Sequence, residues 1–370
     1  MYICGISCDT MINFLFFLPF ILLYIVVVVY AERKVSAFMQ DRLGPMETGK
    51  FGLLQTIADL LKLVQKEDIT PLKADKFLFT LAPFLFFVAV FTGFAFIPLS
   101  VTHVGAGVEV SILFLLAIVS LDILGILAAG WGSANKYGLF GAIRSIAQLV
   151  SYEIPLSLAI LCVVIVSQSL DLQEIILQQG VFTSVKSYFL GIKYSFLETT
   201  TVGGVLTWNI IRFPILFFVF IIFLIASLAE ANRTPFDLPE AESELIAGFH
   251  TEYSSVKFAM LMLAEYSMLL LMSLLVVILF FGGWNSPFPN VGSWQLATWT
   301  SGTPHYFSAL CWGSFWLLSK TFCVIFLKMW VRWTYPRLRI DQTMELCWKY
   351  LTPFALVFVL ICSVWRLLIA

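Results

Sequence analysis

Long apolar stretches separated by short charged connections are the feature that most constrains how this chain can fold. Stretches of about 20 apolar residues suit helices that cross a bilayer, because a helix satisfies its own backbone hydrogen bonds. With 60% hydrophobic and 12% charged residues, the chain does not have the composition of a soluble globular domain. We predict an all-α membrane protein, a bundle of eight transmembrane helices in a single integral membrane domain, residues 1–370. The predicted spans are about 11–31, 77–98, 109–130, 145–168, 211–230, 256–282, 306–330 and 347–369.

The distribution of basic residues predicts the orientation of these spans. Most of the 22 Lys and Arg residues fall in connections on one side, including those around 32–76 and 328–349. Cytoplasmic loops carry an excess of Lys and Arg, so these connections are predicted to lie inside and both termini outside. The formal net charge of −1 gives no reason to expect a nucleic-acid partner.

The first inside connection contains a predicted amphipathic surface helix. Its apolar positions 53, 54, 57, 60, 61 and 64 share one helical face, whereas Asp59, Lys62 and Lys66 share the other. This pattern is typical of a helix that lies flat on lipid headgroups. Alternatively, the helix forms the wall of a cavity that opens at the bilayer edge and admits an amphipathic ligand.

Carboxylates crowd the connection that follows the fifth span. Glu240, Glu242 and Glu244 alternate with other residues in a chain that otherwise carries little charge. Neighbouring carboxylates raise one another's pKa, which allows them to load and release protons near neutral pH. The pattern therefore indicates proton handling.

Further acids are predicted within or at the ends of the spans. Glu153 lies in the fourth span, Glu230 ends the fifth, and Glu265 lies inside the sixth. An ionisable residue inside a membrane is expensive and is a functional hypothesis by default. For Glu153, the simpler alternative is an ion pair with Arg144 that serves packing only.

Two other charged residues lie inside predicted spans. Asp122 is in the third span and Lys320 in the seventh, and pairing across the bundle is the simplest explanation for both. The three histidines share no ligand spacing and the seven cysteines show no CxxC pattern, so no metal site is predicted.

Several segments resemble the signature blocks of the H-subunit (chain 1) family, the eight-helix membrane component of respiratory complex I, NADH:quinone oxidoreductase. The segments are AERKVSAFMQDRLGP, GLLQTIADLLKLVQKE, GWGSANKYGLFGAIRSIAQLVSYE, AEANRTPFDLPEAESELIAGFHTEYSS, LAEY and VRWTYPRLRIDQTMELCWK. They run in family order over nearly the whole chain. The HTEYSS form is more similar to bacterial members than to mitochondrial ones. The resemblance thus implies a multi-pass protein of the bacterial cell (inner) membrane rather than the mitochondrial inner membrane.

The resemblance also implies which residues form a site. Family members form most of the chamber where the quinone head reaches the last iron–sulfur cluster, and acids lead from that chamber into the membrane. A proton relay is implied at Glu153, Glu230, Glu240, Glu242, Glu244 and Glu265. The quinone chamber and its mouth are implied at Glu32, Arg33, Arg42, Asp59, Lys62, Arg233, Phe236, Asp237, Tyr266, Arg337 and Arg339.

Cofactors and partners follow from the same resemblance. Quinone is the implied substrate, whereas FMN, NADH and the iron–sulfur clusters are implied on partner subunits. The implied partners are the hydrophilic arm near the terminal iron–sulfur cluster, antiporter-like membrane subunits and membrane lipid. Two alternatives stay open: the equivalent anchor subunit of an energy-converting hydrogenase or formate hydrogenlyase, and a stand-alone ion-coupled transporter. The second is disfavoured because carriers commonly show internal repeats, and none is visible in this chain.

Overall fold

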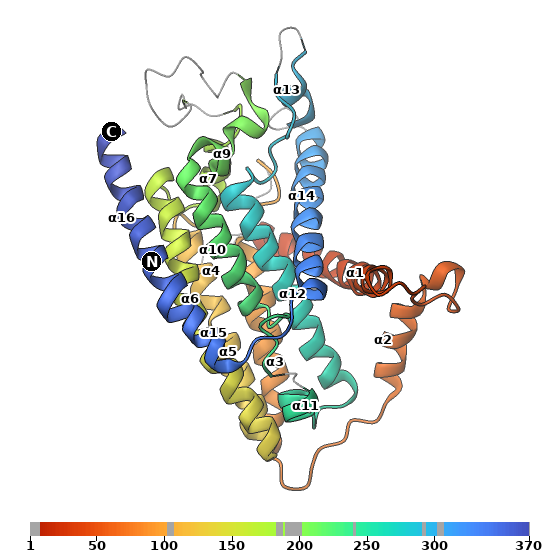
Figure 1. Ribbon diagram of the computed structural model, residues 1–370. Coiled ribbons are helices and arrows are strands. Elements are labelled where there is room, and N and C mark those ends of the chain that lie inside the picture. Colours follow the sequence, from red (N-terminus) through yellow and green to blue (C-terminus); the bar gives the residue numbers. More distant parts are fainter. Residues whose placement is uncertain are drawn as a thin grey trace.

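The computed structural model describes residues 8–101, 107–182, 188, 202–239, 242–290, 294–301 and 307–369, without the side chains of 8–18, 242, 243, 307 and 369. These residues form helices and connections, and no β-strand occurs among them. The long helices α3 (Lys76–Gly93), α6 (Lys136–Ser167), α10 (Pro214–Glu230), α12 (Ser255–Phe280) and α14 (Phe307–Thr334) lie alongside one another (Figure 1). The predicted all-α fold class is confirmed.

Six helical segments in the described part of the chain are long and apolar enough to cross a membrane. They are Lys76–Phe96, Ser111–Gly132, Lys136–Ser167, Ser255–Phe280, Ser308–Thr334 and Ile340–Leu368. Helix α10 is apolar but has only 17 residues, and α1 (Cys8–Met39), which contains the first predicted span, is not among the six. The chain is a multi-pass membrane protein, and the number of eight spans stays a prediction.

The third predicted span is divided into two helices, and the fourth begins earlier than predicted. The predicted span 109–130 consists of α4 (Ser111–Val119) and α5 (Asp122–Gly132), separated where Leu121 donates its backbone N–H to Ile118, three residues back, at 3.1 Å. Helix α6 starts at Lys136 rather than near 145, because the side chain of Asn135 accepts the N–H of Tyr137 at 3.0 Å and caps the helix.

The remaining helices are short, except for the last. They are α7 (Leu172–Gln178), α9 (Asn209–Arg212), α11 (Glu242–Leu245), α13 (Leu296–Ser301), α15 (Ile340–Glu345) and α16 (Thr352–Ile369), with a π-helical segment, Leu346–Leu351, between the last two. Helix α16 lies at the edge of the bundle, next to α6 and α10 (Figure 1).

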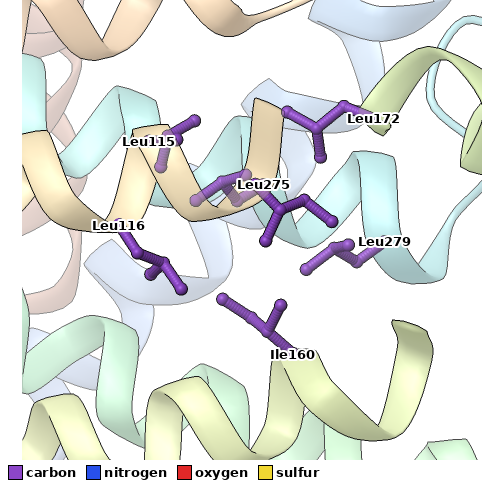
Figure 2. Close-up of a pocket in the computed structure, with 7 residues that line it drawn as sticks. Leu115, Leu116, Ile160, Leu172, Leu275 and Leu279 are labelled. Carbon is purple, nitrogen blue, oxygen red and sulfur yellow. The ribbon is translucent and has the colours of Figure 1, made fainter. Parts of the chain in front are cut away.

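Helix α12 is the centre of the bundle. In its most apolar 18-residue segment, 89% of the residues are buried, against 22% for the corresponding segment of α15–α16. A narrow gap beside α12, which has no room for a water molecule, is lined entirely by apolar side chains. Figure 2 shows that these side chains point into one space between α4, α6, α7 and α12, among them Leu115, Leu116, Ile160, Leu172, Leu275 and Leu279. This part of the core has no group that could perform chemistry.

Helix α2 (Gln55–Gln65) is the predicted amphipathic helix, and it stands apart from the bundle (Figure 1). Its end is tied to the start of α12, because the Ser255 hydroxyl donates to the carbonyl oxygen of Lys66 at 2.7 Å. The apolar face is not covered by the described part of this chain. Leu53, Leu54, Ile57, Leu61 and Val64 are 55%, 55%, 43%, 59% and 63% exposed.

Candidate functional site

Glu32, near the end of α1, is the centre of a buried group of charges. Its carboxylate accepts a hydrogen bond from the Tyr266 hydroxyl of α12 at 2.8 Å and forms an ion pair with Arg332 of α14. Arg233, in the loop after α10, lies 3.8 Å from the same carboxylate, and its guanidinium is 4.1 Å from the centre of the Tyr266 ring. Glu32, Arg233, Tyr266 and Arg332 form the Glu32 cluster, which joins three helices and a loop.

A small hollow of about 10 Å³ adjoins the Glu32 cluster. It is lined by Glu32, Arg233, Leu269, Lys328, Met329 and Arg332. Glu32, Arg233 and Tyr266 were predicted for the chamber, whereas Arg332 and Lys328 were not. The only sequence signal for Arg332 was its place in the VRWTYPRLR block, because its partner lies three hundred positions away.

A second contact holds the loop after α10 against the connection between α14 and α15. The Asp237 carboxylate is buried and accepts a hydrogen bond from Arg337 at 3.0 Å. Burial raises the pKa of Asp237 above its ordinary value, and the Arg337 guanidinium opposes that rise. Phe236 is buried next to them and packs edge-on against the ring of Tyr152, with 5.1 Å between ring centres.

The other residues implied for the chamber are more exposed. Arg33 of α1 pairs with Asp59 of α2 at 2.6 Å, which ties α2 to α1. Lys62 is exposed on α2, and Arg42, in the turn after α1, donates to Gln40 at 2.7 Å. Neither Lys62 nor Arg42 joins the Glu32 cluster in the described part of the chain.

Arg339 lines another hollow than the one beside the Glu32 cluster. It is exposed at the start of α15 and lines an open hollow of about 280 Å³ together with Arg144, Glu244 and Arg337. The hollow therefore adjoins Glu244 of the acidic connection, the segment that contains Glu240, Glu242 and Glu244. It also adjoins Arg337 of the Asp237–Arg337 contact.

Three acids come together inside the bundle from three different helices. Asp122 of α5 interacts electrostatically with Glu153 of α6, and Glu230 of α10 interacts with both. Asp122 and Glu230 are only 1% and 4% exposed. Among the described residues, no Lys, Arg or His forms an ion pair with any of the three. Asp122, Glu153 and Glu230 form the acid cluster. Crowded acids without a cation can share protons, because full ionisation would place like charges next to one another.

The packing alternative for Glu153 is wrong. Arg144 pairs with Glu244, at 2.5 Å, and not with Glu153. Arg144 lies on the part of α6 that extends beyond the predicted span, so its side chain reaches the acidic connection instead.

The expected pairing of Lys320 with Asp122 is also wrong. The Lys320 ammonium donates to three backbone carbonyl oxygens just beyond the end of α12, where the helix leaves carbonyls without a helical partner. The acceptors are Phe281 at 2.8 Å, Gly283 at 3.0 Å and Asn285 at 2.5 Å. Lys320 is therefore a helix-end contact, and Asp122 belongs to the acid cluster.

Glu265 of α12 lies in a contact that the sequence did not reveal. Its Oε1 is 2.9 Å from Nε2 of His250, in the short helix η5 (Gly248–His250), and both side chains are buried. The spacing of histidines along the sequence cannot reveal a partner on another helix. Glu240 and the side chain of Glu242 lie outside the described residues, so the crowding of the acidic connection stays a prediction.

Comparison with known proteins identifies the family. The family model for NADH dehydrogenase matches residues 12–363. The chain is 54% identical to the second H subunit of NADH-quinone oxidoreductase from Cytophaga hutchinsonii, over 95% of this chain and 97% of that relative. It is 51% and 50% identical to the H subunits of the same oxidoreductase from Chlorobium luteolum and Chlorobaculum tepidum, over 95% and 94% of this chain and 87% and 90% of those relatives. The chain therefore belongs to the NADH dehydrogenase family, as a multi-pass membrane subunit of NADH-quinone oxidoreductase, complex I, whose other subunits are its partners.

Proposed function

We propose that this chain forms most of the quinone chamber of the complex and contains the acidic relay that links quinone reduction to proton translocation. The acid cluster is the observation that carries the proposal. A carboxylate that serves packing is normally paired, as Asp237 is with Arg337. Asp122, Glu153 and Glu230 gather on three helices without a cation among the described residues, which suits groups that exchange protons.

The chamber is proposed at the Glu32 cluster and the adjoining Asp237–Arg337 contact. A quinone has a polar head and an apolar tail, so its site needs charged or hydrogen-bonding groups next to an apolar passage. The side chains of the Glu32 cluster supply the charged and hydrogen-bonding groups, and the exposed apolar face of α2 suits the wall of the passage. Arg33, Asp59 and Lys62 would line the passage, with Arg42 and Arg339 at its mouth.

Coupling in this proposal is electrostatic. Reduction of quinone consumes protons or creates negative charge, and such a change alters the proton affinity of nearby carboxylates in a low-dielectric setting. Glu240, Glu242 and Glu244 would respond first, and Glu230, Glu153 and Glu265 would pass the change toward pumping subunits. Asp122 joins this relay because of its place in the acid cluster.

The proposal extends to the assembly and its location. The hydrophilic arm would dock near the chamber with the terminal iron–sulfur cluster, partner subunits would hold FMN, NADH and the clusters, and antiporter-like subunits would adjoin the membrane domain. Bacterial relatives named for NADH and quinone support the bacterial inner membrane and favour quinone chemistry over a hydrogenase anchor.

The test is the double variant Glu153→Gln and Glu230→Gln in the intact complex, reconstituted into liposomes. Proton translocation and the quinone reduction coupled to it are expected to fall by about 10²-fold, with an unchanged amount of assembled complex. Glu174→Gln, which changes an exposed acid on α7, is the matched control. Normal proton translocation in the double variant contradicts the relay, and unchanged turnover and translocation in Glu240→Gln plus Glu242→Gln would remove the acidic connection from it.

A further inference from the structure

The imidazole of His250, a few residues after the acidic connection in the chain, contacts Glu265 of α12. Its Nε2 is 2.9 Å from Glu265 Oε1, and the two side chains are 2% and 7% exposed. One proton can lie on either side of this contact. When it moves, the Nε2–H bond breaks and the Oε1–H bond forms, so the imidazole becomes the acceptor and the carboxyl the donor, with no other group changed.

Two phenyl rings pack against the imidazole of this contact. The centre of the Phe249 ring is 4.0 Å from that of the imidazole, and the Phe258 ring approaches it edge-on at 5.9 Å. Electrostatic interactions are stronger where water is excluded. The contact between His250 Nε2 and Glu265 Oε1 is therefore stronger than the same contact would be in water.

The short helix η5, which carries His250, is in close backbone contact with two other segments. A Cβ atom at Gly248 would lie 2.2 Å from the carbonyl oxygen of Pro239, and one at Gly141 of α6 would lie 2.7 Å from Cα of Gly248. Gly248 also has a φ of +53°, in the left-handed region. A side chain cannot be accommodated at Gly248, so the backbone of η5 packs directly against α6 and the start of the acidic connection.

The link between α11 and η5 is short and strained. Ile246, directly after α11, has a φ of 64°, which is unfavourable for a β-branched residue. The Thr251 hydroxyl donates to the carbonyl oxygen of Gly248 at 2.7 Å and closes η5 on its other side. A displacement of α11 therefore reaches His250 over only a few residues.

We propose that His250 is a positioning residue that ties the protonation of Glu265 to the position of α11. With α11 in its observed place, His250 shares a proton with Glu265. When α11 moves, the contact opens, and Glu265 exchanges its proton with other acids of the relay instead. The proposal rests on the relay role of Glu265 proposed above. Asp237, which interacts electrostatically with Glu265, connects the same acid to the chamber side.

The test compares His250→Leu and His250→Gln in the intact complex in liposomes. The leucine removes the contact with a similar volume, and its kcat for coupled proton translocation is expected to fall roughly tenfold while the KM for quinone stays the same. The glutamine keeps a hydrogen bond but cannot ionise, so its kcat is expected to lie between leucine and wild type. A wild-type kcat in His250→Leu, or an equal change in kcat and KM, overturns the inference.

Matched variants separate the possible causes of a loss. Thr251→Val removes the hydroxyl that closes η5 and leaves the imidazole in place, so it is expected to keep the wild-type kcat. An equal loss in Thr251→Val would assign the effect to a loosened loop and overturn the inference. Glu265→Gln tests the relay itself, because a wild-type rate there contradicts the proposed function. A low rate in Glu265→Gln with a wild-type rate in His250→Leu contradicts only the role of His250.

A spectroscopic measurement does not depend on turnover. Glu265→Gln identifies the carboxyl C=O stretching band of Glu265 in infrared difference spectra of the complex. His250→Leu is expected to shift that band, because the carboxyl loses its partner at 2.9 Å. An unchanged band would show that His250 does not influence Glu265 and would overturn the inference.

Discussion

The Glu32 cluster and the acid cluster are both buried, yet they hold charge in opposite ways. In the Glu32 cluster one carboxylate lies between two guanidinium groups and a tyrosine hydroxyl. In the acid cluster, Asp122, Glu153 and Glu230 interact mainly with one another, and no ion pair with a described residue reaches them. The first arrangement has permanent charges that hold helices together, and the second has charges that depend on bound protons.

The physical reason is the expense of burying charge. Two opposite charges out of water offset part of each other's desolvation penalty when they are in contact. Acids without a cation avoid the penalty only by holding protons. A membrane subunit that must keep its shape and also move protons needs both arrangements, in separate places.

The largest loss of thermal stability is expected for Glu32→Gln, which tests whether the Glu32 cluster holds the helices together. The amide leaves Arg233 and Arg332 close together without a carboxylate, in a place where the Glu32 side chain is only 9% exposed. Breaking one partner of a buried pair costs about 3 kcal/mol, so the assembled complex should lose activity at a lower temperature. Glu345→Gln, which changes an exposed ion pair with Lys349, is the control. Equal thermal inactivation of both variants would show that the Glu32 cluster does not hold the helices.

A smaller effect of the opposite sign is expected for Asp122→Asn. Asparagine has nearly the same shape and cannot add negative charge to the acid cluster, so repulsion between the acids falls or stays equal. Thermal stability of the complex should change by no more than about 1 kcal/mol, and not downward. The same thermal inactivation measurement applies, and a loss as large as that of Glu32→Gln would show that Asp122 is a structural acid.

The smallest effect is expected at Asp237, which combines features of both groups. It pairs with Arg337, yet burial raises its pKa and nearby Glu265 adds to the rise. Because the folded-state pKa is above the unfolded value, the protonated acid is favoured in the fold. The contribution of Asp237 to the stability of the fold is fully present below the unfolded pKa, about 3.9. This contribution is lost as pH rises through the folded pKa. Asp237→Asn should therefore show a weaker decrease of thermal stability with rising pH, and an identical pH dependence would contradict this.

Much of the fold could be predicted because its signals are local. The amphipathic pattern at 53–64 predicted α2. Six of the eight predicted spans correspond to helical segments that are long and apolar enough to cross a membrane. Boundaries were less predictable. Asn135 caps α6 earlier than hydropathy alone suggests. The third span divides at Leu121, where the N–H groups of Leu121 and Leu124 each bond to a carbonyl three residues back.

The site was predictable only as a set of candidates. Glu153, Glu230 and Glu265 stood out because acids are rare in apolar stretches, but their spacing in the sequence says nothing about their neighbours. Glu265 contacts His250. The acids that interact with Glu230 are Asp122 and Glu153. Lys320, which has the same sequence signal as the acids, contacts the end of α12.

The sequence by itself determined the class of protein, the amphipathic helix beside the bundle, the placement of acids within apolar stretches and, through its quoted blocks, the family. Those properties depend on residue type, on helical periodicity and on order along the chain. The tertiary structure decided which charges meet: Glu32 with Arg332, Asp237 with Arg337, His250 with Glu265, and Asp122 with Glu153 and Glu230. Such pairs are set by how helices far apart in the chain cross and rotate against one another, and no local pattern encodes that.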